Sequence, residues 1–143
     1  MQVEKMDLNK HSIEDIKTIL ALAVGNPTPE KLQKLVDEYC ISDSRTIYSA
    51  IQNDKIIGII GIDCTQRPNG LISHLAVLQE SRTQGIARHL IGYTAELLEL
   101  TGIEAETDQD AVDFYRACGF ETEEIESRYP GVGRFRCIKR YSR

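Results

Sequence analysis

The stretch LAVLQESRTQGIARHLI, residues Leu75 to Ile91, indicates more about this chain than any other segment. An apolar run leads through a short turn that contains Gly85 into a sequence whose apolar residues recur at helical spacing. A strand, such a turn and a helix N-terminus together direct several backbone N–H groups at one point, where the positive end of the helix dipole also lies. This arrangement binds phosphate groups. The segment therefore predicts a phosphate-binding site. The rest of the sequence is needed to infer which phosphate-containing ligand binds there.

The composition predicts one acidic domain. The chain has 143 residues, of which 41% are hydrophobic, and this is enough to fill one core. Its net charge is −5, whereas nucleic-acid-binding proteins usually carry an excess of basic residues, so we expect no nucleic-acid partner. The N-terminal segment has no apolar signal core, and no apolar run approaches the roughly 20 residues of a membrane helix. We expect a single domain over residues 1–143, cytoplasmic and without a membrane partner.

The cysteines give no sign of a metal site. Cys40, Cys64, Cys118 and Cys137 stand far apart and form neither a C-x-x-C pair nor a pattern with histidine. We expect reduced, mostly buried thiols and no metal.

Hydrophobic periodicity and turn residues predict the elements. The first helix starts at Ser12 as N-cap and ends at Gly25-Asn26-Pro27, and the second starts near Thr28. Asn53-Asp54 is typical of a tight hairpin turn, and Gly102 fits the left-handed position after the third helix. The predicted strands are 2–8, 46–51, 55–63, 71–77, 103–107, 120–125 and 134–139, and the predicted later helices are 85–100 and 110–117.

The resulting order is β-α-α-β-β-β-α-β-α-β-β. An antiparallel meander followed by a β-α-β crossover belongs to the α/β class, with a mixed, mostly antiparallel central sheet and helices on both faces.

Two motifs carry a family resemblance. R-x-x-G-x-A at Arg82, Gly85 and Ala87, preceded by L-A-V, resembles the acetyl-CoA-binding motif of the GNAT N-acetyltransferases. AVDFYRACGF, residues 111–120, is similar to the second signature of that family, in which a Phe-Tyr pair on a helix precedes a Gly-Phe turn. One short glycine motif recurs by chance, whereas two at the right spacing inside the GNAT element order are specific. The resemblance covers essentially the whole chain.

The resemblance implies how acetyl-CoA binds. The amides of residues 83–88 would face the pyrophosphate, with added charge from Arg82. The backbone amide of Leu75 would face the thioester carbonyl, and residues 76–77 would pair with pantetheine like an added strand. Asp108 replaces an asparagine found in many relatives, so it either contacts the cofactor or caps the helix after it. The implied cofactor-binding residues are Leu75, Ala76, Val77, Arg82, Thr83, Gln84, Gly85, Ile86, Ala87, Arg88, Asp108 and Tyr115.

Tyr115 is the candidate catalytic side chain. The tyrosine of the Phe-Tyr pair in the family often protonates or hydrogen-bonds the leaving thiolate, and Phe114 is then its core partner. The alternative is that both rings only pack in the core.

The sequence does not identify the general base that would deprotonate the acceptor amine. Some relatives carry a glutamate where this chain has Leu71. Strand alternation directs Ser73 toward the acceptor and His74 toward a helix layer. Deprotonation through water, or by a carboxylate such as Glu38, Asp43 or Asp63, stays open.

Acceptor recognition in the family involves segments that correspond here to Gly25–Lys31 and Ser127–Gly133. Tyr129 would line the acceptor cleft or anchor its loop. Arginines at 128, 134 and 136 would bind an acceptor anion or remain solvated.

The function implied is acetyl-CoA-dependent N-acetyl transfer to a primary amine by direct attack in a ternary complex. The expected acceptors, in order of preference, are a small amine, an amino-acid-like metabolite and a protein N-terminus. Homodimers are common in the family. The competing hypothesis is a catalytically idle acyl-CoA-binding sensor or interaction module.

Overall fold

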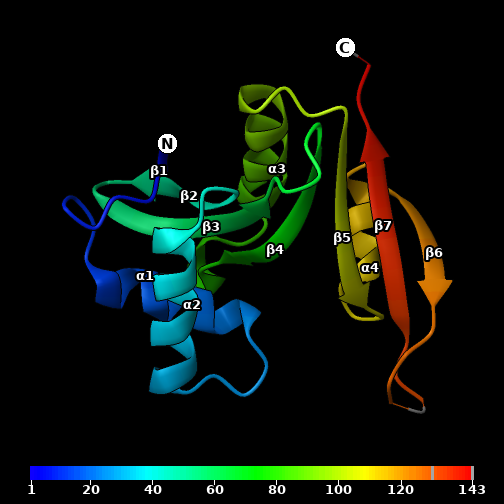
Figure 1. The fold of residues 1–143 in the computed structure, drawn as a ribbon, viewed down its shortest axis with the longest axis horizontal. Helices are drawn as coiled ribbons and strands as arrows, with labels where there is room; N and C mark the ends of the chain where they lie inside the picture. The colour runs from blue at the N-terminus through cyan, green and yellow to red at the C-terminus, as the bar shows by residue number, and fades with distance from the viewer. Residues whose placement is uncertain (130, 143) are drawn as a thin grey trace.

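The computed structural model describes residues 1–129 and 131–142, which form a seven-stranded sheet in the order β1-β2-β3-β4-β5-β7-β6 (Figure 1). The sheet is antiparallel except between β4 and β5, and its helices cover both faces. The predicted fold class is therefore confirmed. The elements are β1 (Gln2–Lys5), α1 (Ile13–Leu20), η1 (Ala21–Ala23), α2 (Pro29–Ile41), β2 (Arg45–Gln52), β3 (Lys55–Asp63), β4 (Asn69–Val77), η2 (Gln79–Ser81), α3 (Ile86–Leu97), β5 (Gly102–Asp108), α4 (Val112–Ala117), β6 (Glu121–Ile125) and β7 (Arg134–Arg140).

Two apolar clusters, one on each face of the sheet, hold the layers together. One joins β3 and β4 to α1 and α2, with Ile16 and Val36 fully buried at its centre. The other joins the sheet to α3 and α4 through residues such as Leu90 and Tyr115. Because both faces of β2 and β3 are covered, the middle of each strand is buried without a polar face.

Local chemistry explains the elements that the sequence predicts best. The hydroxyl of Thr28 accepts a hydrogen bond from the backbone N–H of Lys31 (3.2 Å) and so caps α2. Asn53 and Asp54 both have positive φ, as a two-residue hairpin turn between β2 and β3 requires.

Several predicted boundaries are wrong by a few residues. The first strand ends at Lys5 rather than residue 8. The first helix ends at Leu20 and continues as a short 3₁₀ turn, and the Ser12 side chain makes no capping hydrogen bond. The helix predicted from residue 110 begins at Val112, and Asp110 and Ala111 precede it in a turn whose backbone N–H groups donate to the side chain of Asp108.

Gly102 does not have the predicted left-handed conformation. The residue with positive φ after α3 is Glu99 (φ 52°), and Gly102 begins β5. A Cβ at Gly102 would lie 2.5 Å from Oδ1 of Asn69, so glycine is needed for close approach. This contact stands at the point where β4 and β5 meet.

Strands β4 and β5 pair over a short stretch and then separate. Their paired positions are Asn69–Gly102, Gly70–Ile103 and Leu71–Glu104. Beyond these pairs β4 follows β3 while β5 follows β7, and the two strands diverge (Figure 1). The edges that face each other there are left open for another extended chain.

A bulge lies where the strands begin to part. Gly61 of β3 is opposite His74, and Ile62 is opposite Ile72, so Ser73 is an extra residue in β4. A bulge bends the strand and reverses its alternation of faces. The α1–α2 face therefore receives His74 and the α3–α4 face receives Leu75, whereas Ile72 is on the same face as Leu75.

Candidate functional site

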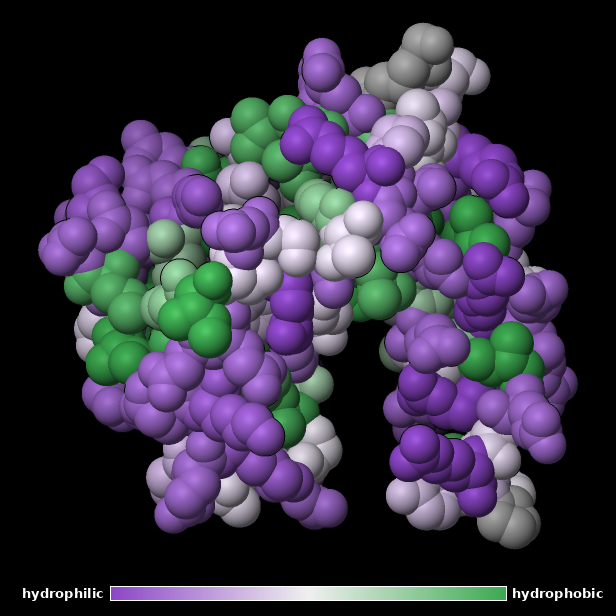
Figure 2. All heavy atoms as spheres, in the orientation of Figure 1, coloured by the Kyte–Doolittle hydropathy of each residue, from purple (hydrophilic) through white to green (hydrophobic). Residues whose placement is uncertain are grey.

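A cavity of about 1010 Å³ fills the space between the diverging strands. Its walls are β4, the turn before α3, the end of β5, the inner side of α4 and η1. Figure 2 shows the same surface deeply hollowed between the part that carries α1 and α2 and the part that carries β6 and β7. Most of the residues predicted to form the site line this one cavity.

The turn before α3 has the conformation that an anion site needs. Thr83 and Gly85 both have positive φ (67° and 76°), and α3 begins directly after them at Ile86. Left-handed residues at such a turn direct neighbouring backbone N–H groups to one side. Thr83, Gly85, Ile86, Ala87 and Arg88 line the cavity, whereas Gln84 is exposed and is not among its lining residues.

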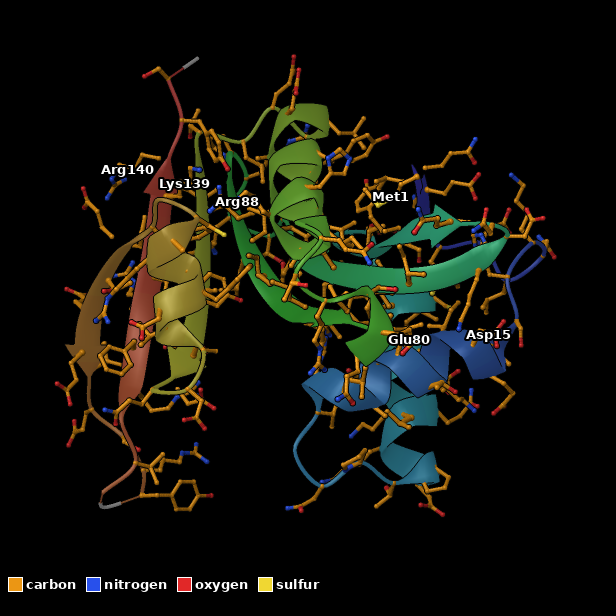
Figure 3. All side chains as sticks on the ribbon, turned by 180° about the vertical axis from the view of Figure 1, so that it is seen from behind. Met1, Asp15, Glu80, Arg88, Lys139 and Arg140 are labelled. Atoms are coloured by element: carbon orange, nitrogen blue, oxygen red, sulfur yellow. The ribbon has the colours of Figure 1, made fainter. Side chains whose placement is uncertain are left out.

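The two arginines of this turn are tied to the protein backbone. Arg82 Nε donates to the carbonyl of Val77 at the end of β4 (3.2 Å), which closes the turn on the strand that precedes it. Arg88 Nη2 donates to the carbonyl of Ala117 (2.5 Å), and Lys139 Nζ donates to that of Cys118 (2.7 Å). Figure 3 shows Arg88 and Lys139 beside the same end of α4. Both arginines thus build the site, and their charges remain next to the turn.

Asp108 caps the turn that leads into α4. Its Oδ1 accepts hydrogen bonds from the backbone N–H groups of Asp110 and Ala111, each at 3.0 Å. The sequence left open whether Asp108 caps the helix or contacts the cofactor, and these hydrogen bonds are those of a cap. Asp108 also lines the cavity.

Tyr115 stands on the α4 wall of the cavity. Its ring is packed edge-on between Phe114 and Phe120, with both centroids at 5.2 Å, and it is 6% exposed. Burial raises the pKa of its phenol, so the hydroxyl keeps its proton at neutral pH. Phe114 also lines the cavity and packs against the core.

The β4 wall contains Ser73, His74, Leu75, Ala76 and Val77. The bulge at Ser73 puts Ile72 on the opposite face from His74, although strand alternation predicted a shared face. The expectation that His74 faces a helix layer is confirmed. Its side chain packs toward the α2 layer and still lines the cavity beside Ser73. Leu71 precedes the bulge and is 43% exposed outside the cavity.

His74 is held by a residue that the sequence analysis did not select. A hydrogen bond of 2.5 Å joins its Nδ1 to Oη of Tyr39, a buried residue of α2. The guanidinium of Arg45 lies over the Tyr39 ring, 4.7 Å from its centroid, and pairs with Glu38 (3.4 Å). A hydrophobic stripe on a predicted helix gives no signal for such a polar contact.

The far end of the cavity is formed by η1 and β5. Leu22, Ala23, Val24 and Gly25 line it from one side and Glu106 and Thr107 from the other. Within the described part of the β6–β7 connection, Tyr129 is 67% exposed and does not line the cavity. Pro130 of the same predicted segment lies outside the described residues. Arg136 pairs with Glu104 and Glu123, so it is not a free anion site.

A family model described as "Acetyltransferase (GNAT) domain" matches residues 43–122, which include β4, the turn and all of α4 with its tyrosine. The chain belongs to the GNAT acetyltransferases. Among curated protein sequences no match to it is found.

Solved structures share the fold of this GNAT acetyltransferase along its whole length. An aminoglycoside 6′-N-acetyltransferase complexed with coenzyme A has a TM-score of 0.84 at 15% identity, covering 98% of this chain and 97% of its own. The ribosomal-protein-S18-alanine N-acetyltransferase of Escherichia coli has a TM-score of 0.79 at 16% identity, covering 99% and 94%. A Bacillus subtilis acetyltransferase in complex with CoA has a TM-score of 0.73 at 19% identity, covering 99% of both chains.

Several cavity residues of this GNAT domain were missed by sequence reasoning. Ser81 in η2 is buried at the turn, and Cys118 follows α4 next to the tyrosine wall. The cysteines are unpaired, with Cys118 and Cys137 buried, Cys64 partly buried and Cys40 exposed. No helix in residues 1–129 or 131–142 is long and apolar enough to cross a membrane.

Proposed function

We propose that this protein transfers the acetyl group of acetyl-CoA to a primary amine by direct attack in a ternary complex. The observation that carries the proposal is the single cavity between β4 and β5, because it joins an anion-binding turn at one end to a buried phenol on its wall. Such a turn can bind the phosphates of a thioester cofactor, and a phenol near the sulfur can donate a hydrogen bond to the leaving thiolate.

The protein groups that would hold acetyl-CoA fit its chemistry. The backbone around Thr83 and Gly85 and the N-terminus of α3 offer N–H groups to the pyrophosphate. The open edges of β4 and β5 offer N–H and C=O groups to the amide-containing pantetheine arm. A volume of about 1010 Å³ leaves space for an acceptor beside it.

Two donors would stabilise the reacting group. The backbone N–H of Leu75 on the cavity wall would donate to the thioester oxygen as it gains negative charge, and one such donor is worth roughly 3 kcal/mol. Tyr115 would donate a hydrogen bond to the leaving sulfur. Its raised pKa makes it a persistent donor rather than a strong acid, so its part is to stabilise the thiolate charge.

The preferred acceptor is a small molecule with a primary amine. Glu106 and Asp108 in the cavity wall suit a cationic amine, and apolar residues of η1 line the same cavity. Ser73 is proposed to contact this amine, and Tyr129 is proposed only as a residue of the cleft entrance. The cytoplasmic location and a homodimer remain predictions.

The test combines binding and turnover. Acetyl-CoA binding is measured by calorimetry, and CoA release is followed with kanamycin, spermidine, phenylethylamine and a peptide with an N-terminal alanine. We expect binding, and turnover with at least one amine. Tyr115→Phe is expected to lower kcat about tenfold or more, while Tyr48→Phe, a buried tyrosine outside the cavity, keeps the wild-type rate. Tight binding without turnover of any amine would favour the idle acyl-CoA module instead.

A further inference from the structure

The pair formed by His74 and Tyr39 brings an ionisable group to the cavity wall. The two residues come from β4 and α2, and Oη of Tyr39 lies 2.5 Å from Nδ1 of His74. Nδ1 is hydrogen-bonded to Tyr39, and His74 lines the cavity. Nε2 is therefore the ring nitrogen that can interact with a molecule in the cavity. A side-chain partner for Nε2 is absent among the residues that the structure describes.

Two local features make this contact possible. The extra residue at Ser73 turns His74 to the α2 face at the point where the cavity opens. Tyr39 then crosses β3 at Gly61, where a Cβ would lie 2.1 Å from its Oη. The glycine and the bulge together bring the phenol to the imidazole.

The tyrosine itself is held in place. Arg45 covers its ring and is held by Glu38, and the residue as a whole is 3% exposed. Burial raises the pKa of Tyr39, so the phenol stays neutral, although the hydroxyl of Ser73 and the charge of Arg45 act in the opposite direction. A neutral, fixed phenol oxygen can accept a hydrogen bond from Nδ1.

The charges around His74 favour the neutral imidazole. Burial lowers its pKa, Arg45 from β2 lowers it further, and Glu38 from α2 opposes both. Across the cavity β5 presents Glu106 and Asp108. At neutral pH the ring is therefore uncharged and able to take up a proton.

We propose that His74 is the general base that accepts the proton of the acceptor amine at Nε2, and that Tyr39 is the positioning residue that fixes Nδ1–H. The proposal rests on the proposed function. It is supported by position, because His74 directly precedes Leu75, whose amide is proposed to face the thioester oxygen, while Tyr115 stands on the α4 wall of the same cavity.

The step balances without a further reactant. The amine nitrogen forms a bond to the acetyl carbon, the C–S bond breaks, and the electron pair leaves on sulfur. His74 Nε2 takes the proton lost by nitrogen. The thiolate is stabilised by the Tyr115 hydroxyl, and the proton on His74 returns through solvent, so that an amide and a free thiol result.

The kinetic test compares histidine variants. His74→Gln is expected to lower kcat about 100-fold and to remove the decrease in rate that the wild type shows when His74 becomes protonated at low pH. His89→Gln, on the exposed surface of α3, is the matched control and keeps the wild-type rate and pH profile. A full-rate His74→Gln enzyme overturns the role of His74 while leaving the proposed function intact. A wild type that turns over none of the four amines overturns both.

The tautomer test does not need turnover. Nitrogen-15 NMR of the histidine rings is expected to show His74 protonated at Nδ1 and bare at Nε2 near neutral pH. In Tyr39→Phe the Nε2–H tautomer is expected to become populated and kcat to fall about tenfold with unchanged KM, because the base is present but less often in its reactive form. An Nε2–H tautomer in the wild type contradicts the proposal, since that nitrogen could not accept a proton.

Discussion

Replacing Gly61 with alanine tests the packing that brings Tyr39 to His74. The new Cβ would lie 2.1 Å from Oη and 2.8 Å from Cζ of the tyrosine, so the ring must move. Overpacking of a core costs about 1–3 kcal/mol, and loss of the hydrogen bond to His74 costs about 1 kcal/mol. Alanine recovers about 0.5–1 kcal/mol relative to glycine in a strand, so the expected net loss in the free energy of unfolding is about 2 kcal/mol.

Urea denaturation of four proteins provides the measurement: the wild type, Gly61→Ala, Tyr39→Phe and the double variant. Tyr39→Phe removes Oη, the closest of the clashing atoms, so Gly61→Ala should cost about 1 kcal/mol less in that background. Gly92→Ala in α3 is the control, because nothing lies within 4 Å of its new Cβ, and it should stabilise the protein by about 0.5–1 kcal/mol. Unchanged stability of Gly61→Ala, with the wild-type tautomer of His74 retained, would refute the reasoning.

Three further predictions concern turns between the elements. Gly85→Ala has free space for its Cβ but a φ of 76°, so we expect about 1 kcal/mol of strain and weaker acetyl-CoA binding in a calorimetric titration. Asp108→Ala should lower the free energy of unfolding by about 1 kcal/mol because Ala111 N–H loses its acceptor, whereas Asp108→Asn keeps an oxygen there and should cost less. Hydrogen bonds from Thr65 hold the pKa of Asp63 below its usual range, so the stabilisation is present above the unfolded-state pKa and is lost as pH falls through the folded-state pKa. Asp63→Asn should therefore make urea-measured stability less sensitive to pH below about 4.

The sequence predicted the parts of the fold that depend on neighbouring residues. Thr28 followed by proline starts a helix, and Asn53-Asp54 forms the hairpin turn, because each effect arises within a few residues. The phosphate turn belongs to the same class. Its strand, glycine and helix are contiguous, so its position between β4 and α3 could be predicted.

Features that depend on residues far apart in the chain could not be predicted. The extra residue at Ser73 is visible only against its partner strand, and without it the alternation rule placed Ile72 on the same face as His74. Gly102 looked like a helix end, but its small size serves the contact with Asn69 across two strands. Thr83 has a left-handed conformation that β-branched residues rarely adopt, so a threonine at this position does not predict it.

The central claim is that the cleft where β4 and β5 part holds acetyl-CoA. A crystal structure of the protein grown with acetyl-CoA tests it most directly. The account predicts the pyrophosphate on the backbone N–H groups of residues 83–88 and the thioester between β4 and Tyr115 of α4. A pyrophosphate bound elsewhere, with this cavity filled only by solvent, would contradict it.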